Sequence, residues 1–93
     1  MIREEQNGPI RWQQDSIAGV PLQRFIGHAG TVEVGFVEFD SGNRMWIWSS
    51  GLADDAWGWA PTGDGAKLAL ELWLRTWLEN FRALFDGRAA PMP

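Results

Sequence analysis

Apolar residues recur between Thr62 and Gly87 with the period of an α-helix. At about 100° per residue, one broad arc holds the apolar positions, namely Ala66, Leu70, Trp73, Leu74, Trp77, Leu78, Phe81, Leu84 and Phe85. The polar residues Glu71, Arg75, Thr76, Glu79 and Arg82 fall on the opposite side. The pattern predicts one helix of roughly 35 Å. That exceeds the width of a three-stranded sheet, so we expect one end to overhang.

Residues at both ends of this segment match helix boundaries. The Thr62 hydroxyl can accept a hydrogen bond from a first-turn amide, and Asp64 suits the positive end of the helix dipole. Gly87 suits a left-handed C-cap. The predicted helix therefore begins after Thr62 and ends near Gly87.

Leu68 and Leu72 break the pattern, because they fall among the charged positions and are spaced to touch each other. Two interpretations are open. The N-terminal arm or the Trp-rich loop folds over them, or they form an exposed apolar stripe that meets a partner or a second copy of the chain.

Before the helix, the alternation of apolar and polar residues predicts strands. Candidates are Ile10–Gln14, Leu22–Ile26, Thr31–Asp40 and Arg44–Ser49. Within the third strand, apolar positions switch parity between Phe36 and Val37. A bulge near residues 35–37, or burial on both faces, would explain the switch. In the last strand Met45 and Ile47 face one way and Trp46 and Trp48 the other, so one pair should meet the helix.

The fold class that follows is α+β: an antiparallel sheet of three, possibly four, strands packed on one long C-terminal helix. We expect a flexible arm over residues 1–9, a single domain over 10–87 and a disordered tail over 88–93. Residues 15–21 and 50–61 are predicted to be irregular, because glycine and proline interrupt both stretches.

Composition narrows the function classes. The 93 residues include seven Trp and five Phe but no Cys, which excludes thiol catalysis and Cys-based zinc sites. The polar N-terminus predicts no secretory signal, and no apolar run is long enough to cross a membrane, so we expect a cytoplasmic protein. The net charge of −4 and the scattered basic residues disfavour duplex nucleic acid as a partner. An acidic surface suits docking onto a basic face of another protein.

Two acidic residues and two tryptophans stand together before the helix: Asp54, Asp55, Trp57 and Trp59. Carboxylates beside aromatic rings can bind a sugar. The alternative is that both Trp residues close the open end of the sandwich of helix and sheet while the Asp pair is solvated. The following Gly-rich stretch lacks the order of a phosphate-binding loop, because Ala66 precedes Lys67 and Leu68 replaces the hydroxyl residue. We therefore expect no nucleotide and no other cofactor.

Other constellations are weaker. His28 is the only histidine, and no serine stands at a spacing from it that would identify a catalytic nucleophile. The simpler interpretation is that His28 is a turn residue. With one His and no Cys, a metal site is not expected. Arg44, Trp46 and Trp48 could stack single-stranded bases. Cross-strand pairing of Arg44 with a carboxylate is the competing interpretation.

Three stretches of the C-terminal half carry a resemblance. They are Met45-Trp46-Ile47-Trp48-Ser49-Ser50, Trp57-Gly58-Trp59-Ala60-Pro61-Thr62 and Ala66-Lys67-Leu68-Ala69-Leu70-Glu71. In the order of elements the chain resembles small proteins of phages and proteobacteria, among them the anti-CRISPR inhibitors. The resemblance is one of class and assigns no functional residue. It implies an inhibitor that binds another protein.

The function predicted from the sequence is thus a small, acidic, non-enzymatic protein-binding module of the phage-inhibitor type. Its contact residues would be Glu33, Glu38 and Asp40 on the strand, Asp54, Asp55, Trp57 and Trp59 in the loop, and Leu68 and Leu72 on the helix. The leucine pair could also form a homodimer. The alternatives are a carbohydrate-binding module using the Trp loop and a single-stranded nucleic-acid binder.

Overall fold

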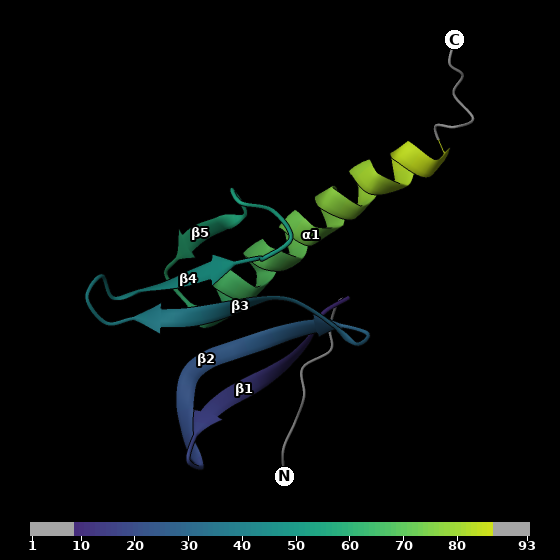
Figure 1. Ribbon diagram of the computed structural model, residues 1–93. Coiled ribbons are helices and arrows are strands. Elements are labelled where there is room, and N and C mark those ends of the chain that lie inside the picture. The colour runs from purple at the N-terminus through teal and green to yellow at the C-terminus, as the bar shows by residue number, and fades with distance from the viewer. Residues whose placement is uncertain (1–8, 87–93) are drawn as a thin grey trace.

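A computed structural model describes the backbone of residues 9–86 and the side chains of residues 9–82. The described chain forms five strands and then one helix (Figure 1). The elements are β1 (Arg11–Ile17), β2 (Val20–Ala29), β3 (Val32–Asp40), β4 (Met45–Ser49), β5 (Trp57–Ala60) and α1 (Gly63–Asp86). The predicted α+β class with an antiparallel sheet is confirmed. The predicted strand count is wrong, because the sheet has five strands.

The sheet is an antiparallel meander in the order β1-β2-β3-β4-β5. The helix packs against β3, β4 and β5, and its C-terminal half extends past the sheet (Figure 1). The overhang predicted from the helix length is therefore present. The core between helix and sheet contains Ile10, Trp12, Val34, Val37, Ala60, Ala66, Leu70 and Leu74.

The N-terminus of the helix is capped as predicted. The amide of Gly65 donates to the Thr62 hydroxyl at 2.9 Å, and Asp64 lies in the first turn. Gly87, the tail over residues 88–93 and all of the arm except Pro9 lie outside the described residues.

The parity switch in β3 comes from a bulge. Gly27 pairs with Gly35, but His28 pairs with Glu33, so Val34 is the extra residue. It lies just before the predicted range of residues 35–37. The bulge turns Val34 toward the core, where it joins Val37 of opposite parity.

Close approaches of backbone fix the helix and the sheet relative to one another. A Cβ at Gly35 would lie 2.3 Å from the Ser49 carbonyl oxygen and 2.9 Å from Leu70. At the start of the helix, Gly63 lies against the ring of Trp46. At Gly35 any larger residue would force β4 or the helix to shift, while at Gly63 it would press on the Trp46 ring.

The inner end of the helix also brings a cation into the core. Lys67 is only 8% exposed, and its ammonium nitrogen lies 4.0 Å from the ring centroid of Phe25 and 5.8 Å from that of Trp12. Aromatic faces attract a cation, most strongly where water is scarce. The early lysine of the helix is therefore part of the packing.

Two stretches predicted to be irregular are strands. Residues 15–21 form a hairpin between β1 and β2, whose turn residues Ala18 and Gly19 both have positive φ, 52° and 81°. Within the segment 50–61, Trp57–Ala60 is strand β5, paired with β4. The loop between β4 and β5 is therefore much shorter than predicted.

Candidate functional site

Strand register divides the side chains of β4 and β5 between two faces. Directly paired residues of antiparallel strands share a face, and Ile47 pairs with Trp59 while Ser49 pairs with Trp57. Trp46 and Trp48, by contrast, pack against the core next to the helix. Ile47, Trp57 and Trp59 therefore lie on the face of the sheet opposite the helix. We call these three residues the outer-face patch.

Both tryptophans of the patch are open to solvent. Trp57 is 53% exposed and Trp59 is 44% exposed. The interpretation that they close the end of the sandwich is wrong. The reason lies in Gly58 between them, since the Trp48 ring lies against it, about 2.8 Å from where a Cβ would stand. The Trp48 ring occupies the inner face of β5, so the indoles of Trp57 and Trp59 point outward.

A depression of about 240 Å³ adjoins the patch. It is lined by Glu38, Phe39, Asp40, Ile47 and Trp59. Two of the predicted acidic residues and one predicted tryptophan thus meet at one place. The predicted strand surface and the predicted Trp surface merge here into one site.

Asp40 also shapes the turn that borders this site. Its Oδ1 accepts from the Gly42 amide at 3.1 Å, and its Oδ2 accepts from the Asn43 side-chain amide at 2.7 Å. The carboxylate is thereby fixed in orientation at the rim of the depression.

Arg24 holds the neighbouring carboxylates on the same face. Its guanidinium lies 4.4 Å from the ring centroid of Phe36, and its nitrogens lie 3.3 Å from Asp15 and 3.7 Å from Glu38. Neither Arg24 nor Phe36 was predicted as a site residue from the sequence. Phe36 could have been, because it lies two residues from Glu38 in the same strand and therefore shares its face. The ion pair predicted for Arg44 does not form among residues 9–82.

The remaining acidic candidates lie away from this site. The register of β4 and β5 places Asp54 and Asp55 in the loop at the opposite end of the two strands from Asp40. Glu33 lies at the beginning of β3, also distant along the strand from Asp40. All three are exposed. The five acidic residues therefore do not form one cluster.

Leu68 and Leu72 are exposed on the helix, at 55% and 52%. The Trp-rich loop therefore does not fold over them, and the N-terminal arm, the other predicted cover, lies outside the described residues except for Pro9. The stacking platform predicted from Arg44, Trp46 and Trp48 is not formed either. Trp46 and Trp48 pack against the core beneath the helix, while Arg44 is in the turn after β3 with a φ of 55°.

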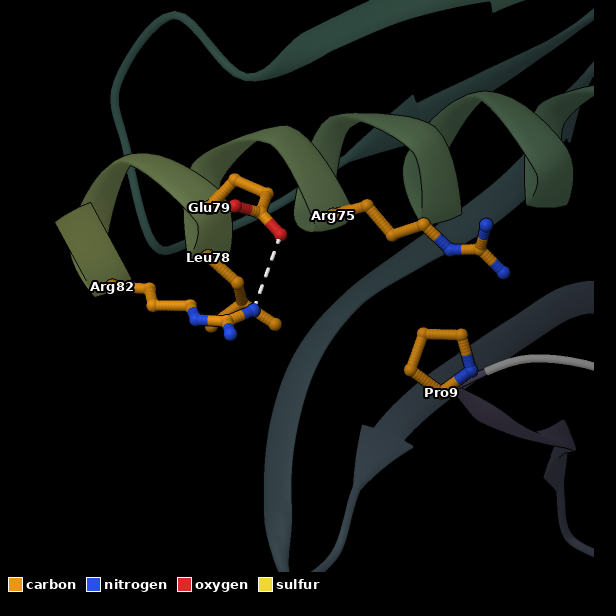
Figure 2. A pocket seen from close by; sticks show the side chains of 5 residues that line it. All are labelled: Pro9, Arg75, Leu78, Glu79 and Arg82. Carbon is orange, nitrogen blue, oxygen red and sulfur yellow. Dashed lines mark ion pairs between the residues drawn. The ribbon is translucent and has the colours of Figure 1, made fainter.

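A second depression, of about 360 Å³, separates the helix from the beginning of β1. Figure 2 shows Arg75, Leu78, Glu79 and Arg82 on one side of the helix, with Pro9 across the opening. Arg82 and Glu79 form an ion pair at 3.5 Å. Three charged side chains line this hollow together with Leu78 and Pro9.

Within residues 9–82, no group of three or more His, Asp or Glu side chains is arranged to hold a metal ion. Among the described residues, no helix combines the length and the apolar character needed to cross a membrane.

Comparison of the chain with known protein families, characterised proteins and solved structures finds no match. The outer-face patch and the acidic depression beside it are the candidate site.

Proposed function

We propose that this protein is a small protein-binding module that uses the outer-face patch to engage a partner with a basic and apolar surface. The observation that carries the proposal is the exposure of Trp57 and Trp59, at 53% and 44%, on adjacent outward positions of β5. Tryptophan is the residue most enriched among the energetically dominant positions of protein interfaces.

The surroundings of the two indoles support a protein partner. Ile47 stands directly across the strand pair from Trp59 and adds aliphatic area at the centre. Glu38 and Asp40 border the same depression and supply a polar, negative rim. An apolar centre with a charged rim is the usual anatomy of an interface, and the rim charges favour a basic partner.

In its specific form, the proposal is a non-enzymatic inhibitor of a host protein complex, of the phage anti-CRISPR type. Leu68 and Leu72 offer a second contact surface on the helix. Because they are on a different element from the patch, their contribution can be separated by mutation.

The test is affinity capture with three forms of the full chain. The unaltered protein should retain a stoichiometric partner from host lysate at low salt and release it as salt rises. The double variant Trp57→Ser/Trp59→Ser should lose that partner, while Ser41→Ala, an exposed turn substitution, should retain it. Equal capture by the unaltered protein and the Trp variant would rule out the patch as the contact.

A carbohydrate ligand is the second candidate, and the depression favours it. Trp59 provides an aromatic face, and Glu38 and Asp40 provide carboxylates beside it. Sugar rings stack on indoles while their hydroxyls donate to carboxylates. Tryptophan fluorescence titrated with a panel of oligosaccharides tests this: a shift that Trp59→Ser removes supports a glycan, and an unchanged spectrum across the panel excludes it.

A further inference from the structure

The depression beside the outer-face patch lies between two unlike walls. Glu38 pairs with Ile47, and Ile47 pairs with Trp59, so the three residues stand side by side across β3, β4 and β5. Neighbouring strands lie about 4.8 Å apart, which places the backbones of Glu38 and Trp59 roughly 10 Å from one another. The depression therefore has a carboxylate on one side, an indole on the other and the aliphatic Ile47 between them.

This part of the sheet carries a surplus of negative charge. Glu38 and Asp40 both line the depression. The nearest ion pairs belong to Arg24, which lies 3.7 Å from Glu38 and 3.3 Å from Asp15. One arginine among these three carboxylates leaves a net charge of −2. Even if Arg44 of the adjoining turn is counted, the charge remains negative, so the depression attracts a cation.

Asp40 keeps the capacity to accept further hydrogen bonds. Its two oxygens each accept one bond, from the Gly42 amide and from the Asn43 side chain. An ionised carboxylate can accept about four. The group is thus held in a fixed orientation and can still receive N–H donors from a ligand.

The same face of the sheet already holds one arginine between an aromatic ring and carboxylates. The Arg24 guanidinium lies 4.4 Å from the centroid of Phe36 and contacts Asp15 and Glu38. A guanidinium is planar, so its flat side stacks on a ring while its N–H groups at the edge reach carboxylates. Trp59 supplies a second aromatic ring on the other side of Glu38. No described Lys or Arg side chain lines the depression next to it.

We propose that the depression is a subsite for an arginine side chain of the partner protein, stacked on Trp59 and hydrogen-bonded to Glu38 and Asp40. This inference rests on the proposed function, because it names the group that the partner presents to the outer-face patch. The volume of about 240 Å³ is below the range of roughly 300–1,000 Å³ that small-molecule sites occupy. It suits one inserted side chain.

Arginine matches these walls better than lysine does. Its methylene stem packs on the aliphatic side chain of Ile47, while its guanidinium presents a flat surface to the indole of Trp59. It is also less strongly hydrated than an ammonium, so less hydration is lost when it enters a half-enclosed site. Lysine offers a compact charge that does not stack, and we expect it to bind more weakly.

The test is a titration of the full chain followed by the NMR signals of the Trp indole N–H groups at low salt. The probe is N-acetylarginine amide, and the matched controls are N-acetylcitrulline amide, which has the same shape without the charge, and N-acetyllysine amide. The signal that is absent from Trp59→Ser identifies Trp59. We expect the arginine probe to shift that signal with a dissociation constant on the order of millimolar, because a single side chain is bound. No shift, or an equal shift with the citrulline probe, overturns the proposal.

Two variants locate the binding. Asp40→Asn keeps an acceptor for the turn but removes the charge, and it should weaken binding of the arginine probe by about three- to tenfold. Trp57→Ser alters the neighbouring outward indole, which does not line the depression, and should change the affinity by less than about twofold. Urea denaturation of each variant shows that it is folded. If both variants bind like the unaltered protein, or if Trp57→Ser is the weaker binder, the depression is not the subsite.

Affinity capture separates a failure of this subsite from a failure of the proposed function. The double variant Glu38→Gln/Asp40→Asn should lose the partner that the unaltered protein retains. A partner that is lost by Trp57→Ser/Trp59→Ser but kept by Glu38→Gln/Asp40→Asn would leave the outer-face patch as the contact and rule out the arginine subsite. Specific binding of the arginine probe without any captured partner would instead support the subsite and count against the protein-binding function.

Discussion

The Ser50 hydroxyl donates a hydrogen bond of 2.6 Å to the carbonyl oxygen of Val34, the extra residue of the β3 bulge. The same oxygen of Ser50 accepts from the Leu52 amide at 3.1 Å. Ser50 is 4% exposed. One buried hydroxyl thus satisfies a carbonyl displaced from the strand ladder and begins the loop that leads to β5.

Ser50→Ala should lower the free energy of unfolding by about 1–3 kcal/mol, because a buried carbonyl loses its partner. Urea denaturation followed by tryptophan fluorescence measures the change. Ser41→Ala, in the exposed turn after β3, should leave the midpoint in place. A loss no greater than in this control would mean that water replaces the hydroxyl.

Gly35→Ala should cost at least about 3 kcal/mol, because the new methyl group would meet backbone oxygen at 2.3 Å and Leu70 at 2.9 Å. The matched control is Gly51→Ala, where the added Cβ has open space around it and φ is not in the left-handed region. Thermal unfolding of both variants tests the pair. Equal melting temperatures would contradict the close packing of α1 on β3.

The tryptophans of the two sheet faces should respond differently to truncation. Trp46→Ala removes a ring that packs against Phe25, Phe39 and the helix start, and should cost about 3 kcal/mol. Trp57→Ser/Trp59→Ser should cost less than about 1 kcal/mol, since both rings are largely in solvent. Denaturation of the three proteins decides this. A large loss in the double variant would make the patch structural.

Lys67 and Phe25 should be energetically coupled. A double-mutant cycle of Lys67→Met and Phe25→Leu should show a coupling of about 1–2 kcal/mol at constant pH, because the ammonium lies 4.0 Å from the ring in a site poor in water. The cycle of Lys67→Met with Phe81→Leu is the control, since Phe81 lies about 21 Å further along the helix. If the coupling energy is zero in both cycles, the Lys67 ammonium has no favourable interaction with the Phe25 ring, and Lys67 contributes only through packing.

The helix was predictable because its signals are local. Thr62, Asp64 and the periodic apolar residues act within a few positions of one another, and the structure follows them. The alternation of β4 was equally readable, and the parity switch in β3 indicated a bulge, although the bulge lies at Val34, just before the predicted range.

Strand β5 was missed because its four residues contain Gly58 and depend on pairing with β4, which is information from elsewhere in the chain. The turn end of the hairpin of β1 and β2, residues 15–21, was missed for a different reason, although the central part of each strand was predicted. This end is exposed at Ile17 and Val20, so no burial pattern marks it, and Ala18 adopts a positive φ that alanine disfavours.

The site was predictable in its residue types but not in its assembly. Trp57, Trp59, Glu38 and Asp40 were all selected from the sequence, yet only the register of three strands shows that Trp59 joins the two carboxylates. Parity alone separates Trp46 and Trp48 from Ile47, but it does not decide which set meets the helix.

The order of elements along the chain has a consequence for biosynthesis. All five strands are made before α1, and each pairs with its immediate predecessor, so the meander can assemble hairpin by hairpin as the polypeptide grows. The apolar face of the sheet, which carries Trp12, Trp46 and Trp48, remains exposed to solvent until α1 has been synthesised. A chain truncated before Gly63 would therefore expose the apolar face of the sheet and would be prone to aggregate.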